Sequence, residues 1–157
     1  MRVEFWMIGK TNEAYLKEGM EIYQKRLVRY LPFHAVIYPD IKNAGKLSSQ
    51  QLKQKEGEFI LSKLKSDDFL ILLDEKGKQF TSEEFAQYVD HKHQLSYKRI
   101  IFQIGGAFGF SDAMYQRANA KLGLSKMTFS HQMIRLFFLE QLYRAMTILR
   151  NEPYHNH

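Results

Sequence analysis

The sequence predicts a single α/β domain over residues 1–157, with a mainly parallel sheet flanked by helices. Short apolar segments alternate with longer segments in which apolar residues recur at helical spacing, and this alternation is typical of a parallel sheet. The segment Phe69–Leu73 is apolar without interruption, as in a strand buried on both faces. No linker, repeat or low-complexity segment divides the chain, whose length is sufficient for one stable core.

The first third predicts a strand, a helix and a second strand. Val3–Ile8 is the first strand, and Asn12 is expected to cap the helix after it. The second strand is expected at Phe33–Tyr38, before Pro39. The apolar face expected for the helix comprises Tyr15, Gly19, Ile22, Tyr23 and Leu27.

The middle of the chain predicts two helices with clear N-terminal signals. Residues 40–47 are expected to form an exposed loop, after which Ser48 and Gln51 form a capping box. The buried strand Phe69–Leu73 then runs into a second loop over residues 74–78, and Thr81 with Glu84 forms another capping box. The inward residues expected on these helices are Leu52, Phe59, Ile60 and Leu64, then Phe85, Tyr88 and Val89.

Residues 100–110 predict a buried strand followed by a glycine-rich loop. Gly105, Gly106 and Gly109 follow a β-branched and aromatic run, and Ser111 caps the next helix. Such a loop at the carboxyl end of a strand is a candidate ligand site, because peptide groups without Cβ atoms can approach a ligand closely. A tight turn without a ligand is the alternative. The spacing does not match the dinucleotide-binding fingerprint.

The last third predicts a short helix at residues 112–120, an extended segment at 121–125, a loop at 127–130 and a long helix at 131–150. The long helix carries more apolar surface than one stripe on a sheet requires. We interpret the excess as a homodimer interface, with a central helix buried inside one chain as the alternative.

Composition limits the classes of function. There is no cysteine, which excludes disulfides, thiolate nucleophiles and cysteine-ligated metals and fits a reducing cytoplasm. The net charge of +6 favours a polyanionic partner such as RNA over a plain basic surface. His91 and His93 lack further ligands nearby and are interpreted as surface residues. No apolar run is long enough to cross a membrane.

Several segments together resemble the RlmH family, the SPOUT-class methyltransferases that modify a pseudouridine of 23S ribosomal RNA. The resemblance covers essentially the whole chain. The matching segments are Leu72-Leu73-Asp74 with Gly77-Lys78, Ile104-Gly105-Gly106 with Gly109, residues 124–129 leading to His131 and Arg135, residues 140–145, and Tyr154-His155.

This resemblance implies a C-terminal trefoil knot, which pattern reasoning alone would reject. It also implies a homodimer that methylates N3 of a pseudouridine in assembled ribosomes. S-adenosylmethionine is expected at Leu73, Gly105, Leu124, Ser125, Lys126, Met127, Thr128 and Phe129. No metal is expected, because the sulfonium carbon is already electrophilic and the protein has to align the reactants.

The expected catalytic residues are His131, Arg135, Tyr154 and His155, with the tail reaching the partner's cofactor. An imide N–H needs a base or a cationic environment before its nitrogen can attack. A capping role for His131 is the alternative, as is an interface salt bridge for Arg135 or Arg144.

The chain departs from the family pattern at two places. Ser130 stands where a proline is common, which loosens the loop or supplies a capping hydroxyl. After Tyr154-His155 the chain ends in Asn156-His157 without lysine or arginine, so a phosphate contact there would need protonated His157. The alternative functions are a non-catalytic ribosome- or RNA-binding protein and a SPOUT methyltransferase acting on tRNA.

Overall fold

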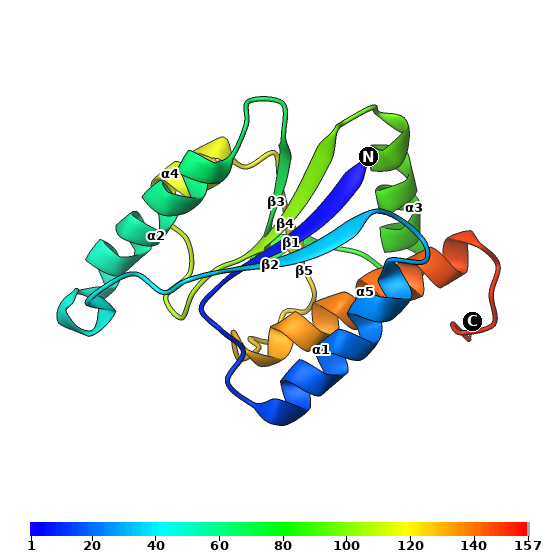
Figure 1. The fold of residues 1–157 in the computed structure, drawn as a ribbon. Helices are drawn as coiled ribbons and strands as arrows, with labels where there is room; N and C mark the ends of the chain where they lie inside the picture. The colour runs from blue at the N-terminus through cyan, green and yellow to red at the C-terminus, as the bar shows by residue number, and fades with distance from the viewer. Residues whose placement is uncertain (157) are drawn as a thin grey trace.

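The computed structural model describes residues 1–156, and its five strands form one parallel sheet in the order β2-β1-β4-β3-β5 (Figure 1). The strands are β1 (Arg2–Ile8), β2 (Phe33–Tyr38), β3 (Phe69–Gln79), β4 (Arg99–Ile104) and β5 (Ala120–Gly123). The helices are α1 (Ala14–Leu27), the 3-10 turn η1 (Ala44–Lys46), α2 (Ser49–Lys63), α3 (Ser82–Gln94), α4 (Asp112–Arg117) and α5 (Met133–Leu149). The predicted α/β class with a parallel sheet is confirmed.

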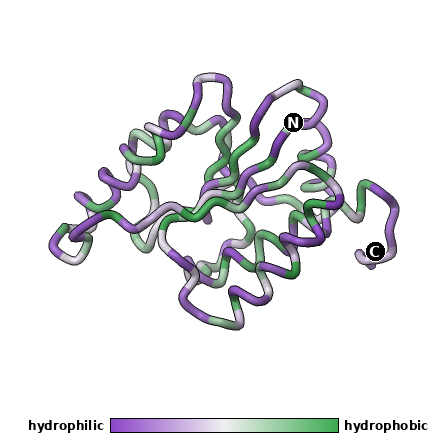
Figure 2. The backbone as a smooth tube through the Cα atoms, in the orientation of Figure 1, coloured by the Kyte–Doolittle hydropathy of each residue, from purple (hydrophilic) through white to green (hydrophobic). Residues whose placement is uncertain are grey.

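Helices cover both faces of the sheet. Helices α1, α3 and α5 lie on one face, and α2 and α4 lie on the other (Figure 1). Figure 2 shows the hydrophobic residues concentrated along the central strands, with hydrophilic stretches in the loops. The larger core is centred on Phe138 of α5, whose ring lies 4.6 Å from that of Phe5 and 4.8 Å from that of Phe102.

Both capping boxes predicted from the sequence are present. The Ser48 hydroxyl accepts a hydrogen bond from the Gln51 N–H at 3.1 Å, and the Gln51 side chain accepts one from the Ser48 N–H at 2.9 Å. Thr81 and Glu84 make the same reciprocal pair. These signals are local, since both partners lie within four residues, and they therefore survive in the tertiary structure.

The prediction for α1 was wrong in its cap and in two residues of its buried face, whereas Leu27 is buried and Gly19 and Tyr23 are half-buried as expected. Glu13 rather than Asn12 is the N-cap, and the Asn12 N–H donates instead to Oε1 of Gln132. Tyr15 and Ile22 are exposed, whereas Leu16, Met20 and Leu27 are buried. Leu16 and Met20 fit the same helical period as the predicted residues, and packing against both the sheet and α5 turns them inward in place of Tyr15 and Ile22.

The boundaries of four elements also differ from the prediction. Strand β3 resumes after residues 74–77, because Leu73 and Lys78 both pair with Leu122 of β5. Helix α4 ends at Arg117, and β5 begins at Ala120. Helix α5 begins at Met133 rather than at residue 131.

None of the helices within residues 1–156 is long and apolar enough to cross a membrane.

Candidate functional site: a cleft at the carboxyl ends of three strands

Three neighbouring strands end in loops at the same edge of the sheet. Strand β4 leads into the glycine loop 105–109, β3 is interrupted by the excursion 74–77, and β5 leads into the loop 124–132. Because parallel strands present their carboxyl ends together, these loops surround one space. This space is a cleft with an open volume of about 630 Å³, large enough for a nucleoside-sized ligand.

The cleft has an apolar floor. Leu73, Ile104 and Leu122 line it and are each less than a tenth exposed. They belong to three adjacent strands, so their positions are fixed by the ladder hydrogen bonds of the sheet. A flat apolar group such as adenine can lie on this floor.

The glycine loop supplies backbone at one wall of the cleft. The Gly109 N–H donates to the Gly106 carbonyl at 3.1 Å, and Gly109 has a φ of +84°, a conformation that favours glycine. A Cβ at Gly105 would lie 3.3 Å from the ring of Phe110. The tight turn therefore depends on glycine, and it leaves peptide groups accessible to a ligand.

The excursion 74–77 and the end of β5 cross at backbone contact distance. A Cβ on Gly77 would lie 2.6 Å from the backbone of Leu122, and one on Gly123 would lie 2.8 Å from the Gly77 carbonyl oxygen. Backbone atoms cannot rotate away as a flexible side chain can. Both positions therefore require glycine, and the crossing fixes the opposite wall of the cleft.

The loop after β5 is ordered by short-range hydrogen bonds. The Ser125 hydroxyl accepts from the Met127 N–H at 3.0 Å, and the Thr128 hydroxyl donates to Glu75 at 2.6 Å across the cleft. The Ser130 hydroxyl accepts from the N–H of Gln132 at 3.2 Å and of Met133 at 3.5 Å. Ser130 thus supplies a hydroxyl to the start of α5, as one of the two sequence interpretations expected.

The structure brings the expected cofactor residues together, with one exception. All of them line the cleft except Lys126, which is exposed between two lining residues. The lining members are Leu73, Gly105, Leu124, Ser125, Met127, Thr128 and Phe129. These residues are spread over positions 73–129 of the sequence. They come together because β4, β3 and β5 are neighbours in the sheet.

The expected catalytic residues His131 and Arg135 lie in different environments. His131 is exposed and lines the cleft. Arg135 is 1% exposed and donates to the carbonyl oxygens of Ile8 at 2.9 Å and Gly9 at 2.8 Å, and to the Thr11 hydroxyl at 3.1 Å. Burial lowers its pKa, against the attraction of the Asp40 carboxylate. In this chain Arg135 anchors the end of β1 to α5.

Tyr154 and His155 lie at the other end of α5. The Tyr154 hydroxyl donates to Glu140 at 3.0 Å, and it lies 3.3 Å from the Tyr23 hydroxyl. Burial and these hydrogen bonds raise the pKa of Tyr154 well above its ordinary value, so the hydroxyl is protonated at neutral pH.

The His155 ring sits between two charged side chains. Its Nε2 lies 2.8 Å from Glu83, and its Nδ1 lies 3.0 Å from Arg144. Arg144 also pairs with Glu140 at 2.5 Å, so its salt bridge lies within the chain. His157, the last residue of the tail, lies outside the described residues.

Two carboxylates of the excursion 74–77, Asp74 and Glu75, accept hydrogen bonds from residues around the cleft. Asp74 accepts from the Tyr115 hydroxyl and from the Lys76 N–H, and Glu75 accepts from Thr128. Burial, followed by the interaction with Asp74, raises the pKa of Tyr115 well above its ordinary value. Tyr115 is therefore a neutral donor that holds Asp74 against α4.

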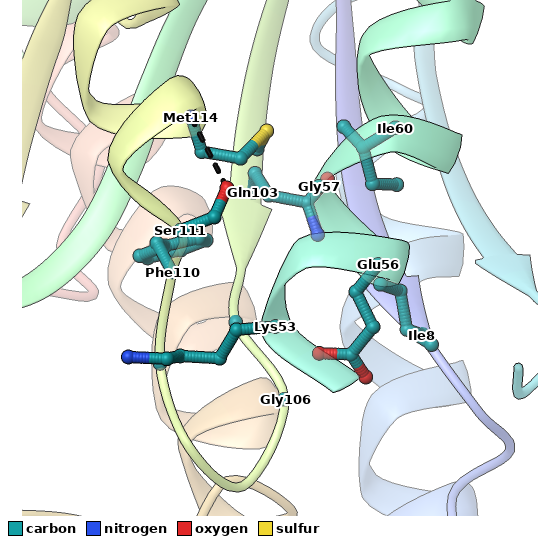
Figure 3. Close-up of a pocket in the computed structure, with 12 residues that line it drawn as sticks. Ile8, Lys53, Glu56, Gly57, Ile60, Gln103, Gly106, Phe110, Ser111 and Met114 are labelled. Carbon is teal, nitrogen blue, oxygen red and sulfur yellow. Dashed lines mark hydrogen bonds between the residues drawn. The ribbon is translucent and has the colours of Figure 1, made fainter. Parts of the chain in front are cut away.

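A smaller cavity lies behind the glycine loop, between α2 and α4 (Figure 3). Its volume of about 10 Å³ is close to the minimum for one water molecule. Gln103 lines it with a buried Oε1 that has no hydrogen-bond partner within residues 1–156. Glu56 lies against Gly106, where a Cβ would be 2.8 Å from both carboxylate oxygens. Burial and the nearby charge of Asp40 raise the pKa of Glu56 to about 7.

Helix α2 was missed as a contributor to the site. Lys53 lines both cavities, and Glu56 lines the small one. The sequence carries one signal for this contribution, a glycine inside the helix at Gly57. Gly57 is buried because Ser111 approaches it, and a Cβ there would lie 2.4 Å from the serine hydroxyl.

Residues 1–156 contain no group of three or more histidine, aspartate or glutamate side chains placed to hold a metal ion. His91 and His93 are both exposed near the end of α3.

Comparison with known proteins gives one consistent match. Residues 1–155 match the family model described as a predicted SPOUT methyltransferase. The chain is 54% identical to the ribosomal RNA large subunit methyltransferase H of Parabacteroides distasonis, over 99% of both chains. It is 58% identical to the protein of the same name from Cytophaga hutchinsonii, over 99% of this chain and 100% of that one.

Among solved structures, the tRNA (m1G37) methyltransferase from Aquifex aeolicus matches with a TM-score of 0.53 at 14% identity, covering 100% of this chain and 76% of that one. At this level of identity the match concerns the fold alone.

Proposed function

The chain belongs to the SPOUT methyltransferase family, and from that premise we propose that it transfers a methyl group from S-adenosylmethionine to N3 of a pseudouridine in the 23S RNA of assembled ribosomes. It does so as a homodimer of single-domain chains in the cytoplasm, where ribosomes are. The observation that supports this proposal best is the cleft, in which three loops from adjacent strands collect residues that the RlmH resemblance assigns to the cofactor.

The residues present fit S-adenosylmethionine. The apolar floor of Leu73, Ile104 and Leu122 suits the adenine, and the loop peptide groups next to it suit the edge of the base. Gly105 and Gly106 allow close approach of backbone to the ligand. When bound, the cofactor supplies a methyl group on a positively charged sulfur, which is already a strong electrophile.

The protein residues then have to orient the nucleophile and manage its proton. His131 stands on the cleft at the start of α5 and is our candidate to accept the N3 proton through a ring nitrogen. Arg135 contributes by holding the start of α5 to the end of β1. This places the His131 backbone relative to the sheet that carries the cofactor site.

The proposed role of Tyr154 and His155 requires the partner subunit. Helix α5 has 17 residues and is therefore roughly 25 Å long, and it separates the tail of a chain from its own cleft. Exposed apolar residues on the packed pair α1 and α5 offer a dimer surface, and they are Tyr15, Ile22, Met133 and Phe137. The same proposal includes the C-terminal trefoil knot that the family resemblance implies. The close backbone crossing of Gly77 and Gly123 supports it.

The direct test is methyl transfer from labelled S-adenosylmethionine to intact ribosomes, to free large-subunit RNA and to bulk tRNA, followed by mass spectrometry of the nucleosides. We expect N3-methylpseudouridine from ribosomes alone. Transfer to tRNA would support the alternative substrate. RNA binding without cofactor affinity in calorimetry would support the non-catalytic alternative.

The shared site can be tested by mixing two inactive variants. His131→Ala removes the proposed base, and deletion of residues 154–157 removes the tail. If the tail serves the partner's cleft, a mixed dimer contains one complete site, and equal mixing restores about a quarter of the sites. Mixtures as inactive as either variant would contradict the shared site.

A further inference from the structure

Phe108 stands at the tip of the glycine loop with 54% of its surface exposed. It lines the cleft, and it is flanked by Ala107 and by Gly109, whose added Cβ would meet nothing within 4 Å. A phenylalanine in this position gains little from burial within its own chain. Its exposure at the mouth of a ligand cleft indicates that a bound ligand covers its ring.

The cleft is graded from a buried floor to an exposed apolar rim. The floor residues Leu73, Ile104 and Leu122 are 7%, 4% and 3% exposed, whereas Met127 on the loop after β5 is 78% exposed. Phe108 and Met127 thus present apolar side chains from two different loops of the same cleft. A cofactor on the floor leaves Phe108, which is not among the residues expected to bind it, for a second ligand at the mouth.

The chemistry of the rim suits a nucleobase. An unstacked base has two flat apolar faces, and proteins that bind single-stranded RNA cover such faces with aromatic side chains. A base that is to be methylated has to leave its stack before it can reach the cofactor, and it then needs replacement stacking. Lys53 and Lys76 line the same cleft and can meet the phosphates that accompany the base.

We propose that Phe108 is a substrate-stacking residue, whose ring covers one face of an RNA nucleobase entering the cleft. This inference rests on the proposed function and adds to it a specific contact with the nucleic acid. It differs from a lid over the cofactor, because a lid would act on cofactor affinity, whereas stacking on the RNA acts on the second substrate.

The test compares Phe108→Ala, Phe108→Leu and Phe108→Trp with the wild type. For each variant, cofactor affinity is measured by calorimetry, and kcat and KM for ribosomes are measured at saturating cofactor. We expect Phe108→Ala to lower kcat/KM for ribosomes about tenfold, mainly through a higher KM, with cofactor affinity unchanged. Loss of the stacking contact with one base typically has an effect of about that size. Phe108→Leu keeps bulk but lacks a π-face and should stay impaired, while Phe108→Trp should recover.

Leu95→Ala is the matched control, because Leu95 is 46% exposed and does not line the cleft. It should leave both substrates unaffected. Loss of cofactor affinity in Phe108→Ala with an unchanged KM for ribosomes would identify a lid and overturn the inference. So would a Phe108→Ala variant that behaves as the wild type. A wild type that methylates no RNA would remove the proposed function, and this inference with it.

Discussion

The two histidines near the ends of helix α5, His131 and His155, are held in opposite ways. At the N-terminal end, the His131 side chain lines the cleft and makes no hydrogen bond or ion pair with the residues between 1 and 156. At the C-terminal end, Tyr154, His155, Arg144 and Glu140 bond to one another or to neighbouring helices. A side chain with unused hydrogen-bonding capacity can meet a ligand at once, whereas one that is already bonded must exchange partners first.

This difference bears on how the tail can act. For Tyr154 to reach a ligand, its hydroxyl has to leave Glu140 and Tyr23, and Glu140 then keeps Arg144 as its partner. At the C-terminal end of α5 the tail is therefore held by hydrogen bonds to its own chain. At the N-terminal end the His131 side chain is already available to a ligand in the cleft.

The largest effect is expected from Arg135→Met, which would break the N-terminal end. The change leaves the carbonyl groups of Ile8 and Gly9 without their donor in a buried place, and we expect a loss of about 3 kcal/mol or more in the free energy of unfolding. Urea denaturation measures it. Arg150→Met is the control, because Arg150 is exposed and contacts Tyr30 through one long hydrogen bond of 3.4 Å to its carbonyl and a cation–π contact of 4.6 Å with its ring. A stable Arg135→Met protein without methyl transfer would assign Arg135 to the chemistry instead.

Deep burial of Arg135 is a feature that the sequence could not supply. An arginine on an amphipathic helix is normally at the surface or snorkels to it. Its carbonyl partners, Ile8 and Gly9, are more than 120 residues away along the chain. The capping boxes, by contrast, were predictable because each closes within four residues.

The cleft could be predicted further than the tail. Strand ends followed by glycine are local signals, and the parallel order of the sheet brings them together, so the residues expected to bind the cofactor, except Lys126, line one space. The places of Glu56 and Phe108 at the two cavities were missed because the partial burial of one and the exposure of the other reverse the usual preference of those residue types. Neither could be read without the packing of α2 and α4 around the glycine loop.

A smaller loss is expected from Gly123→Ala, which tests the crossing beside the cleft. The new methyl group would lie 2.8 Å from the Gly77 carbonyl oxygen and 3.2 Å from that of Asp74, so backbone must move, and we expect a cost of about 2 to 3 kcal/mol. Gly45→Ala is the matched control, since nothing lies within 4 Å of the added Cβ. Denaturation of both variants and calorimetry with S-adenosylmethionine give the measurement. Equal stability of the two would mean that the crossing is not tight.

At the C-terminal end, Tyr154→Phe removes one hydroxyl from the network and should cost about 1 kcal/mol. Glu140 retains Arg144, which limits the loss. If the hydroxyl serves the partner's cleft, the same variant should lower the rate of methyl transfer by more than the decrease in its folded fraction explains. Thermal denaturation and the ribosome assay at the same temperature separate the two effects. A fall in activity that follows the folded fraction would leave the tail with a structural role only.

An effect on stability no larger than that of Tyr154→Phe is expected behind the glycine loop, from Glu56→Gln, and it depends on pH. The folded protein holds the Glu56 proton more tightly than the unfolded chain, because its pKa is raised from 4.5 to about 7. Wild-type stability therefore falls as pH rises through this window, and Glu56→Gln escapes that loss. Solvent screening of the half-buried carboxylate reduces the difference at pH 8 to about 1 kcal/mol, or roughly 2 to 4 °C in Tm. Glu58→Gln, an exposed change on the same helix, is the charge-matched control. A constant difference in Tm between wild type and Glu56→Gln from pH 5 to pH 8 would show that the carboxyl behind the loop is as well solvated as one at the surface.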